Sequence, residues 1–188
     1  MRVLSKEELD KERIKLVRSL RECLFIHPTD TVYGIGCNAT DRKLVHKLRS
    51  AKEQFTRPVS ILVPSKDWIR ENCEVDPNVE DWLDKLPGPY TLILKLKNPD
   101  AIARNVNLSA KTIGVRLPNH WITDIVSDMR MPIVTTSANI TGRQVMTNRD
   151  NLNEKLKKSV EYIIYDGKKE GKASMIVNLT DGEEVLRD

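Results

Sequence analysis

LFIHPTDTVYGIG, residues 24–36, joins a short apolar run to a segment rich in hydroxyl groups and ends with two glycines. In an extended conformation Thr29, Thr31 and Tyr33 would project from one face of the chain. The two glycines allow the backbone to approach a small ligand closely or to turn sharply. We therefore predict a ligand site where this strand ends. The alternative is a strand that simply runs into a glycine turn.

The composition is typical of a chain with one hydrophobic core. Its 188 residues are 39% hydrophobic, which is enough for a single domain over residues 1–188. Basic residues outnumber acidic ones by 31 to 27, so the net charge is +4. An excess of positive charge is compatible with nucleotides, phosphates or RNA as partners.

Cysteine usage and the amino terminus predict the compartment. Cys23, Cys37 and Cys73 are odd in number and contain no C-x-x-C pair, so neither a disulfide framework nor a zinc ribbon is indicated. The amino terminus is charged, and no window approaches the roughly 20 apolar residues that span a bilayer. These features predict a cytoplasmic protein without membrane association.

Helical and strand patterns alternate along most of the chain. The capping box of Ser5 and Glu8 begins a helix that ends near Cys23. Residues 87–89 lead directly into a strand and short glycine turns separate the last strands, so some strand pairs must be antiparallel. We predict an α/β fold with a mixed parallel and antiparallel sheet and flanking helices. We expect strands at 24–26, 59–63, 90–97, 112–118, 132–139, 162–165, 174–179 and 185–186, and helices at 40–52, 65–69, 76–86, 119–129 and 147–160, with N-caps at Thr40 or Asp41, Ser65, Asp76, Asn119, and Thr147 or Asn148.

Hydroxyl and cationic side chains lie near the ends of several predicted strands, and two of these strands carry polar residues at every second position. Ligands of α/β sheets usually bind at strand ends. Hydroxyl and planar guanidinium groups suit oxyanions, because arginine can hold a carboxylate or phosphate through two parallel hydrogen bonds. The set therefore predicts a polyanionic ligand. Its members are Thr31, Lys52, Arg57, Thr112, Arg116, Thr135, Ser137, Asn139 and Ser174.

Each member of this set also has an ordinary explanation. Arg116 could be a surface arginine on a strand, and Lys52 and Arg57 could belong to a solvated basic loop. Ser137 and Asn139 could simply form a turn. Only the joint placement of these residues favours a site.

Several familiar catalytic motifs are missing. The sequence has no G-x-x-x-x-G-K-[ST] loop, so a P-loop is excluded, and Gly34-Ile35-Gly36 is too little for a dinucleotide fingerprint. His27, His46 and His120 fall in three different elements without H-E-x-x-H, so we expect no metal site built by the protein. Ser137 lacks the G-x-S-x-G context of a nucleophilic serine. Covalent catalysis is therefore not favoured.

Four segments together resemble the YrdC-like threonylcarbamoyl-AMP synthase family. They are PTDTVYG at 28–34, the basic loop 52–58, VRLP at 115–118 and SANITG at 137–142. The resemblance covers nearly the whole chain and implies a twisted α/β sheet with a basic concave cavity. It is to the short, single-domain form of the family.

This resemblance implies an activity, L-threonylcarbamoyladenylate synthesis. A family member of this kind would be an ATP-dependent nucleotidyltransferase that uses ATP, L-threonine and bicarbonate and releases pyrophosphate. A tRNA-modifying transferase would consume the adenylate to modify tRNA with N6-threonylcarbamoyladenosine. Mg²⁺ would arrive with the ATP phosphates rather than in a protein cage.

The resemblance also assigns roles to residues. It implies a threonine pocket lined by Thr31, Arg116, Thr135 and Ser174. It implies catalytic cations at Lys52 and Arg57, and a nucleotide site at Lys52, Arg57, Thr112, Ser137, Asn139 and Arg187.

The basic loop departs from the family pattern. The family usually has K-x-R followed by a proline seven residues after the lysine, whereas here Gln54 occupies the arginine position and Pro58 comes one residue early. Arg57 is our candidate for the missing second cation.

Two other functions stay open from the residues alone. The first is an RNA-binding module without catalysis, in which basic residues of 42–58 follow phosphates. The low aromatic content of 5% argues against base stacking. The second is a related carbamoyl-transfer or phosphate-hydrolysing activity, because an oxyanion-lined cleft does not identify its leaving group.

Overall fold

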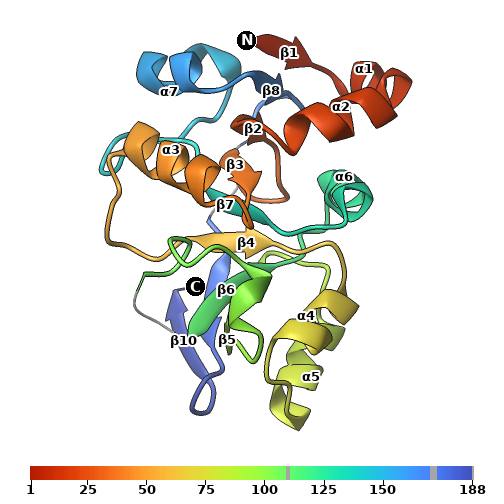
Figure 1. The fold of residues 1–188 in the computed structure, drawn as a ribbon, viewed down its shortest axis with the longest axis vertical. Coiled ribbons are helices and arrows are strands. Elements are labelled where there is room, and N and C mark those ends of the chain that lie inside the picture. Colours follow the sequence, from red (N-terminus) through yellow and green to blue (C-terminus); the bar gives the residue numbers. More distant parts are fainter. Residues whose placement is uncertain (109–110, 170–172, 188) are drawn as a thin grey trace.

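One mixed β-sheet organises the protein. The structure is a computed structural model that describes residues 1–108, 111–169 and 173–187. In these ranges ten strands form a sheet in the order β1-β8-β2-β3-β7-β4-β6-β5-β9-β10 (Figure 1). The strands are β1 (Arg2–Leu4), β2 (Phe25–His27), β3 (Gly34–Asn38), β4 (Ser60–Leu62), β5 (Tyr90–Lys95), β6 (Thr112–Arg116), β7 (Ile133–Ser137), β8 (Tyr162–Ile164), β9 (Met175–Asn178) and β10 (Glu184–Arg187).

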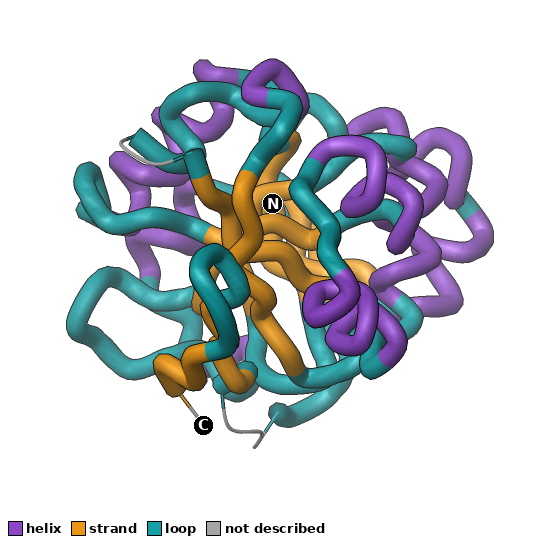
Figure 2. The backbone as a smooth tube through the Cα atoms, turned by 90° about the horizontal axis from the view of Figure 1, so that it is seen from below, coloured by secondary structure: helices purple, strands orange, loops and turns teal. Residues whose placement is uncertain are grey.

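The sheet combines parallel and antiparallel pairs, as predicted. β1 and β2 both pair in parallel with β8, β4 pairs in parallel with β6, and β5 with β9. The other neighbouring pairs are antiparallel. Figures 1 and 2 show the strands as a twisted central layer with helices outside it. The predicted fold class is confirmed.

Short polar side chains begin several of the helices. The capping box of Ser5 and Glu8 is confirmed, and so are the N-caps Asp41, Ser65 and Asp76, each of which accepts a backbone N–H of the first turn. In the described part of the chain, no helix is both long enough and apolar enough to cross a bilayer. The helices are α1 (Lys6–Lys11), α2 (Arg13–Leu20), α3 (Arg42–Lys52), α4 (Lys66–Asn72), α5 (Pro77–Asp84), α6 (Ile122–Met129) and α7 (Glu154–Ser159), with 3-10 turns η1 (Pro99–Ala101) and η2 (Arg149–Asn151).

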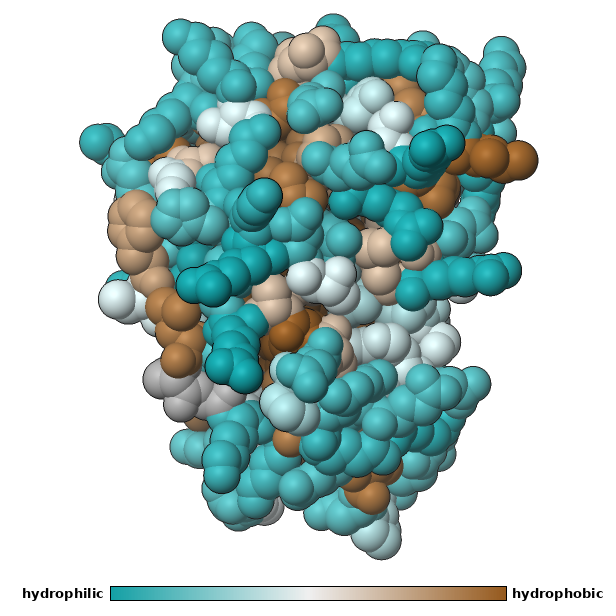
Figure 3. All heavy atoms as spheres, in the orientation of Figure 1, coloured by the Kyte–Doolittle hydropathy of each residue, from teal (hydrophilic) through white to brown (hydrophobic). Residues whose placement is uncertain are grey.

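Apolar side chains pack in two clusters. One includes residues of α3, α4, α5 and α7, and the other includes residues of α1, α2 and α6. Alternation along a strand explains the division, since Leu24 and Ile26 join the first cluster while Phe25 joins the second. The surface seen in Figure 3 is mostly hydrophilic, with apolar residues in separate patches.

The structure corrects the prediction at the amino terminus. Residues Arg2–Leu4 form β1, which we did not predict. This strand is specified by its pairing with β8, near the other end of the chain, so no local pattern reveals it. The single helix expected from Ser5 to Cys23 is instead two helices that meet at Glu12.

The extended conformation considered for Thr29 to Tyr33 is wrong. The hydroxyl of Thr29 accepts hydrogen bonds from the N–H groups of Thr31 and Val32, at 3.1 and 3.2 Å. These bonds fold the segment between β2 and β3 into a turn, as short hydroxyl side chains commonly do.

Two predicted helices differ in their details. Asn119 does not cap the helix that follows it. The N-cap of α6 is Trp121, and the Asn119 N–H donates to Asp30 Oδ2 at 2.9 Å. The helix expected over 147–160 is divided into η2 and α7, which have the separate N-caps Asn148 and Asn153. Residues 109–110 lie outside the described part.

Gly34 makes room for the ring of His27, and this leads to a testable prediction. A Cβ at Gly34 would lie 2.7 Å from His27 Cε1 and Nε2. We expect Gly34→Ala to lower the free energy of unfolding by about 1–3 kcal/mol, because the imidazole is buried and must shift. Urea unfolding measures this cost.

A double-mutant cycle provides the control for the glycine. In a His27→Ala background the clash with the ring is absent, so Gly34→Ala should cost less than half as much. An equal cost in both backgrounds would show that glycine is needed at position 34 for the backbone itself and not to make room for the imidazole ring.

Candidate functional site

A cavity of about 500 Å³ lies on the concave side of the sheet. Seven strands that are consecutive in the sheet, from β3 to β10, each contribute at least one lining residue. The sheet therefore curves around the cavity. Five predicted site residues line it: Arg116, Thr135, Ser137, Ser174 and Arg187.

Arg116, at the end of β6, is the central cation of the cavity. Only 7% of the residue is exposed. Its Nη2 donates to Asp30 Oδ1 at 3.2 Å and to Thr31 Oγ1 at 3.1 Å. Its buried Nε has no hydrogen-bond partner in the described structure. One part of the guanidinium is therefore held by the protein, and Arg116 also lines the cavity.

The positive charge of the cavity is not fully neutralised. Burial lowers the pKa of Arg116, Asp30 opposes that shift, and the charge of Arg187 adds to it. Two guanidinium groups that repel each other in one cavity favour an anionic ligand between or beside them. This agrees with the polyanionic ligand predicted from the sequence.

Arg187 reaches the cavity from the edge strand β10. Its Nε and Nη2 donate to the carbonyl of Ser174, at 2.9 and 2.7 Å, and Nη2 also donates to Ser174 Oγ at 3.2 Å. Ser174 Oγ lies 2.8 Å from Thr91 Oγ1. Thr91 is buried, lines the cavity and was not predicted. The Pro-Gly-Pro break at 87–89 marks the start of β5, and this is the local signal that could have identified Thr91.

Thr31 supports the cavity rather than lining it. Its hydroxyl accepts the hydrogen bond from Arg116 and lies 3.0 Å from Thr29 Oγ1. Thr29 in turn donates its proton to the carbonyl of Val32. The turn of residues 29–32 thus places Thr31 and Asp30 against the guanidinium.

Lys52 lies beneath the loop that follows β7. Its side chain is buried, and its Nζ donates to the carbonyls of Ser137 and Asn139 and to Asn139 Oδ1. Its own carbonyl accepts from the N–H and hydroxyl of Thr141, at 3.2 and 3.1 Å. Burial lowers the pKa of Lys52 to about 8. The ammonium group and the backbone carbonyl of Lys52 therefore together fasten residues 137–141 to α3.

Five of the ten predicted site residues lie outside the cavity lining, and Thr31 and Lys52, described above, are two of them. Arg57 is exposed, although the next residue, Pro58, lines the cavity. Thr112 is at the opposite end of β6 from Arg116, and its carbonyl accepts from Asn107 Nδ2 at 2.6 Å. Asn139 is also outside the lining, but Ser137 Oγ donates to its Oδ1 at 2.6 Å.

Arg49 is a buried cation that sequence reasoning missed. It lies on α3, and only 3% of it is exposed. Its guanidinium donates to the carbonyls of Gln54, Arg57, Asn105 and Val106. It therefore holds the basic loop 52–58 in place through the carbonyls of Gln54 and Arg57, which is a structural role. Its position among exposed basic residues of the same helix gave no signal of this.

His27 is a second buried group that was not predicted as part of the site. It is fully buried, and its Nε2 lies 3.3 Å from Thr135 Oγ1. Burial lowers the pKa of His27 from 6.5 to about 4. The ring is therefore neutral near pH 7.

The buried histidine predicts acid sensitivity. Between pH 6.5 and 4 the unfolded chain binds this proton while the folded chain does not, so stability falls as the pH falls through that window. The contribution is about 3 kcal/mol. We expect His27→Gln to lose less stability than the parent protein over this range, as measured by urea unfolding at each pH. Equal losses in both proteins would contradict the prediction.

The described residues contain no group of three or more His, Cys, Asp or Glu side chains arranged to hold a metal ion. Cys23, Cys37 and Cys73 are free and buried. The donors that line the cavity are guanidinium, hydroxyl and backbone groups, and these suit an anion rather than a cation.

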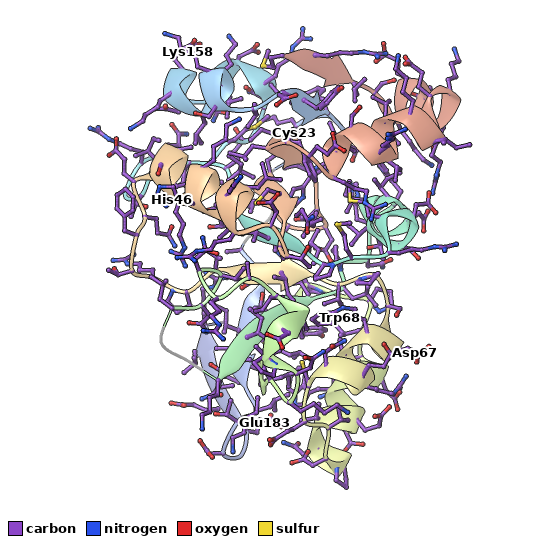
Figure 4. All side chains as sticks on the ribbon, viewed as in Figure 1. Cys23, His46, Asp67, Trp68, Lys158 and Glu183 are labelled. Carbon is purple, nitrogen blue, oxygen red and sulfur yellow. The ribbon has the colours of Figure 1, made fainter. Side chains whose placement is uncertain are left out.

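The exposed cations of α3 are separate from this cavity. Arg42, Lys43 and Lys47 face solvent, while Arg49 and Lys52 are buried. Figure 4 shows His46 on α3 and Lys158 on the neighbouring α7. Of the segment 42–58 considered for RNA, the exposed cations lie outside the cavity lining, and only Pro58 lines the cavity.

Comparisons with known proteins agree on the family. The Sua5/YciO/YrdC family profile, described as "Telomere recombination", matches residues 20–188. A Methanocaldococcus jannaschii protein, provisionally named threonylcarbamoyl-AMP synthase, is 36% identical over 186 residues, which is 94% of this chain and 86% of that protein.

Two solved structures show the same fold. Sua5 of Pyrococcus abyssi, crystallised with L-threonine, has a TM-score of 0.86 and 28% identity, covering 98% of this chain and 56% of that one. The chain thus spans about half of the P. abyssi protein. YciO of Escherichia coli has a TM-score of 0.83 and 22% identity, covering 100% of this chain and 95% of that one.

Proposed function

The chain belongs to the Sua5/YciO/YrdC family, and from this premise we propose that it is an L-threonylcarbamoyladenylate synthase. It would form threonylcarbamoyl-AMP and pyrophosphate from L-threonine, bicarbonate and ATP. The name of the M. jannaschii relative and the L-threonine bound to P. abyssi Sua5 support this proposal. The product would serve N6-threonylcarbamoyladenosine modification of tRNA.

The observation that carries the proposal is the position of Arg116, whose guanidinium is held by Asp30 and Thr31 at the wall of the cavity. A largely buried arginine that lines a cavity is suited to a carboxylate, which can accept charge-assisted hydrogen bonds. We assign the threonine carboxylate to Arg116, held in position by Asp30 and Thr31. Thr135 and Ser174, which also line the cavity, would contact the rest of the amino acid.

The nucleotide would occupy the side of the cavity with Ser137 and Arg187. Lys52 would act there as a positioning residue, since its donors hold the Ser137 to Asn139 segment. Arg57, exposed beside the lining residue Pro58, is placed to reach phosphates that extend from the cavity. We also propose that Thr112 and Asn139 contribute to the nucleotide site.

The reaction needs no covalent enzyme intermediate. The amine of threonine and bicarbonate combine with loss of water to give an N-carboxylate, which attacks the α-phosphate of ATP while pyrophosphate leaves. Both reactants are anions, so the two cavity arginines offset their repulsion, and holding the reactants together removes an entropic barrier. Mg²⁺ would enter as part of the substrate, bridging the ATP phosphates.

Pyrophosphate release tests this proposal. The protein is incubated with ATP, L-threonine and bicarbonate, and each component is then omitted in turn. Release that requires all three, together with the mass of threonylcarbamoyl-AMP, supports the synthase. Pyrophosphate release that does not depend on threonine overturns the proposal and favours a phosphate-hydrolysing activity.

The reaction implies a downstream partner. A mixed carbamic-phosphoric anhydride hydrolyses readily, so a tRNA-modifying transferase would have to consume it. Direct binding of RNA is a separate proposal. Salt-sensitive RNA binding without any turnover of ATP would favour the binding module over the synthase.

A further inference from the structure

His27 is a buried polar group in contact with the cavity wall that the proposed mechanism does not use. It ends β2, and its imidazole occupies a notch left by two glycines of β3. A Cβ on Gly34 would lie 2.7 Å from the ring, and one on Gly36 would lie 3.1 Å from it. The neighbouring strand is thus shaped around this ring.

The hydrogen bonds of the ring define its tautomer. Nδ1 lies 3.2 Å from the carbonyl oxygen of Pro28, and a carbonyl can only accept. The proton of the neutral ring must therefore be on Nδ1, which leaves a lone pair on Nε2. Thr135 Oγ1 lies 3.3 Å from that nitrogen, so Thr135 is the donor in this second bond.

This assignment determines what Thr135 offers to a ligand. A threonine hydroxyl has a single proton and two lone pairs. Once the proton is directed to His27, the hydroxyl oxygen can only accept on its cavity side. Thr135 lines the same cavity as Arg116 and Arg187, whose guanidinium groups can only donate.

We propose that His27 is a positioning residue that makes Thr135 a hydrogen-bond acceptor, so that the bound amino acid must present an N–H or O–H donor to it. The inference rests on the proposed function for the identity of the ligand. It predicts selection for a molecule with a carboxylate for Arg116 and a donor group for Thr135. The donor is either the α-nitrogen or the side-chain hydroxyl of threonine.

Two nearly isosteric variants separate this role from simple packing. Glutamine can place an acceptor oxygen near the position of Nε2, whereas methionine has a similar length without that acceptor. We expect His27→Met to raise the dissociation constant for L-threonine about tenfold, the effect of one lost hydrogen bond. His27→Gln should stay within about threefold of the parent protein. Isothermal titration of the folded proteins measures both, and the KM for ATP should not change.

A second ligand identifies the donor. L-2-aminobutyrate lacks the side-chain hydroxyl of threonine. If the α-nitrogen is the donor, His27→Met weakens both ligands, and if the hydroxyl is the donor, it weakens L-threonine alone. Either outcome supports the proposal. Unchanged affinity for both ligands, or equal losses in the methionine and glutamine variants, would overturn it.

A measurement on the free protein does not depend on the proposed function. The 15N resonances of the imidazole should show a protonated Nδ1 and an unprotonated Nε2 at pH 7. A proton on Nε2 would overturn the inference even in an active synthase. If the protein shows the expected tautomer but makes no threonylcarbamoyl-AMP, the positioning of Thr135 by His27 still holds. Only the identification of the ligand as threonine then fails.

Discussion

Arg116→Ala is expected to raise the dissociation constant for L-threonine roughly 10- to 100-fold, the loss associated with one buried charge-assisted pair. The guanidinium is held by Asp30 and Thr31, and Arg116 lines the cavity. Without it, the threonine carboxylate would enter a buried site with no cation opposite it. Isothermal titration with L-threonine measures the change.

Removing Arg116 also leaves Asp30 without its partner, so alanine alone does not isolate binding. Arg116→Lys keeps a charge beside Asp30 but lacks the planar fork, and it should lose most of the affinity while remaining folded. Arg18→Ala removes an exposed arginine of α2 and serves as a control. Parent-like affinity in a folded Arg116→Lys protein would place the carboxylate elsewhere.

Lys52→Met is expected to lower the free energy of unfolding by about 2–4 kcal/mol, since hydrogen bonds from a charged group to buried carbonyls are lost. The acceptors left behind are the carbonyls of Ser137 and Asn139. The corresponding decrease in melting temperature is roughly 5–15 °C for a chain of this size. Pyrophosphate release should also fall, because residues 137–141 lose their anchor.

Lys158→Met provides the matched control for Lys52, because Lys158 is exposed on α7 (Figure 4). It should change neither stability nor turnover appreciably. The pH profile gives a further check. Since the pKa of Lys52 is about 8, the ammonium loses a proton as the pH rises through this value, and kcat/KM should decline above it. Lys52→Arg should remove this decline, because arginine remains charged.

Capping residues and strand alternation made much of the fold predictable. Asp41, Ser65 and Asp76 cap helices through bonds to the next few residues, so the information is local. The strand expected at 112–118 forms as β6, and Arg116 at its end lines the cavity. By contrast, β1 exists only through its pairing with β8, and no pattern in three residues could reveal it.

Five predicted site residues with hydroxyl or cationic side chains lie together, while their roles remain predictions. Arg116, Thr135, Ser137, Ser174 and Arg187 do line one cavity.

Residues that act through another group were missed. His27 meets Thr135 only because β2, β3 and β7 lie together. Arg49 was hidden because its burial depends on the loops packed over α3. Such contacts join residues far apart in the sequence, and periodicity within one element cannot report them.

The order of strands in the sheet also determines when a newly made chain can bind its ligand. Ser174 and Arg187 belong to the same wall as Arg116, yet they emerge from the ribosome long after it. A nascent chain whose residue 187 is still inside the ribosome lacks part of the pocket. In addition, the pairing of β1 with β8 closes a long stretch of the polypeptide into a loop. Sheets built this way fold slowly because distant segments must meet before they are stabilised. Affinity for the proposed amino acid should therefore develop abruptly once residue 187 has emerged, rather than growing with chain length.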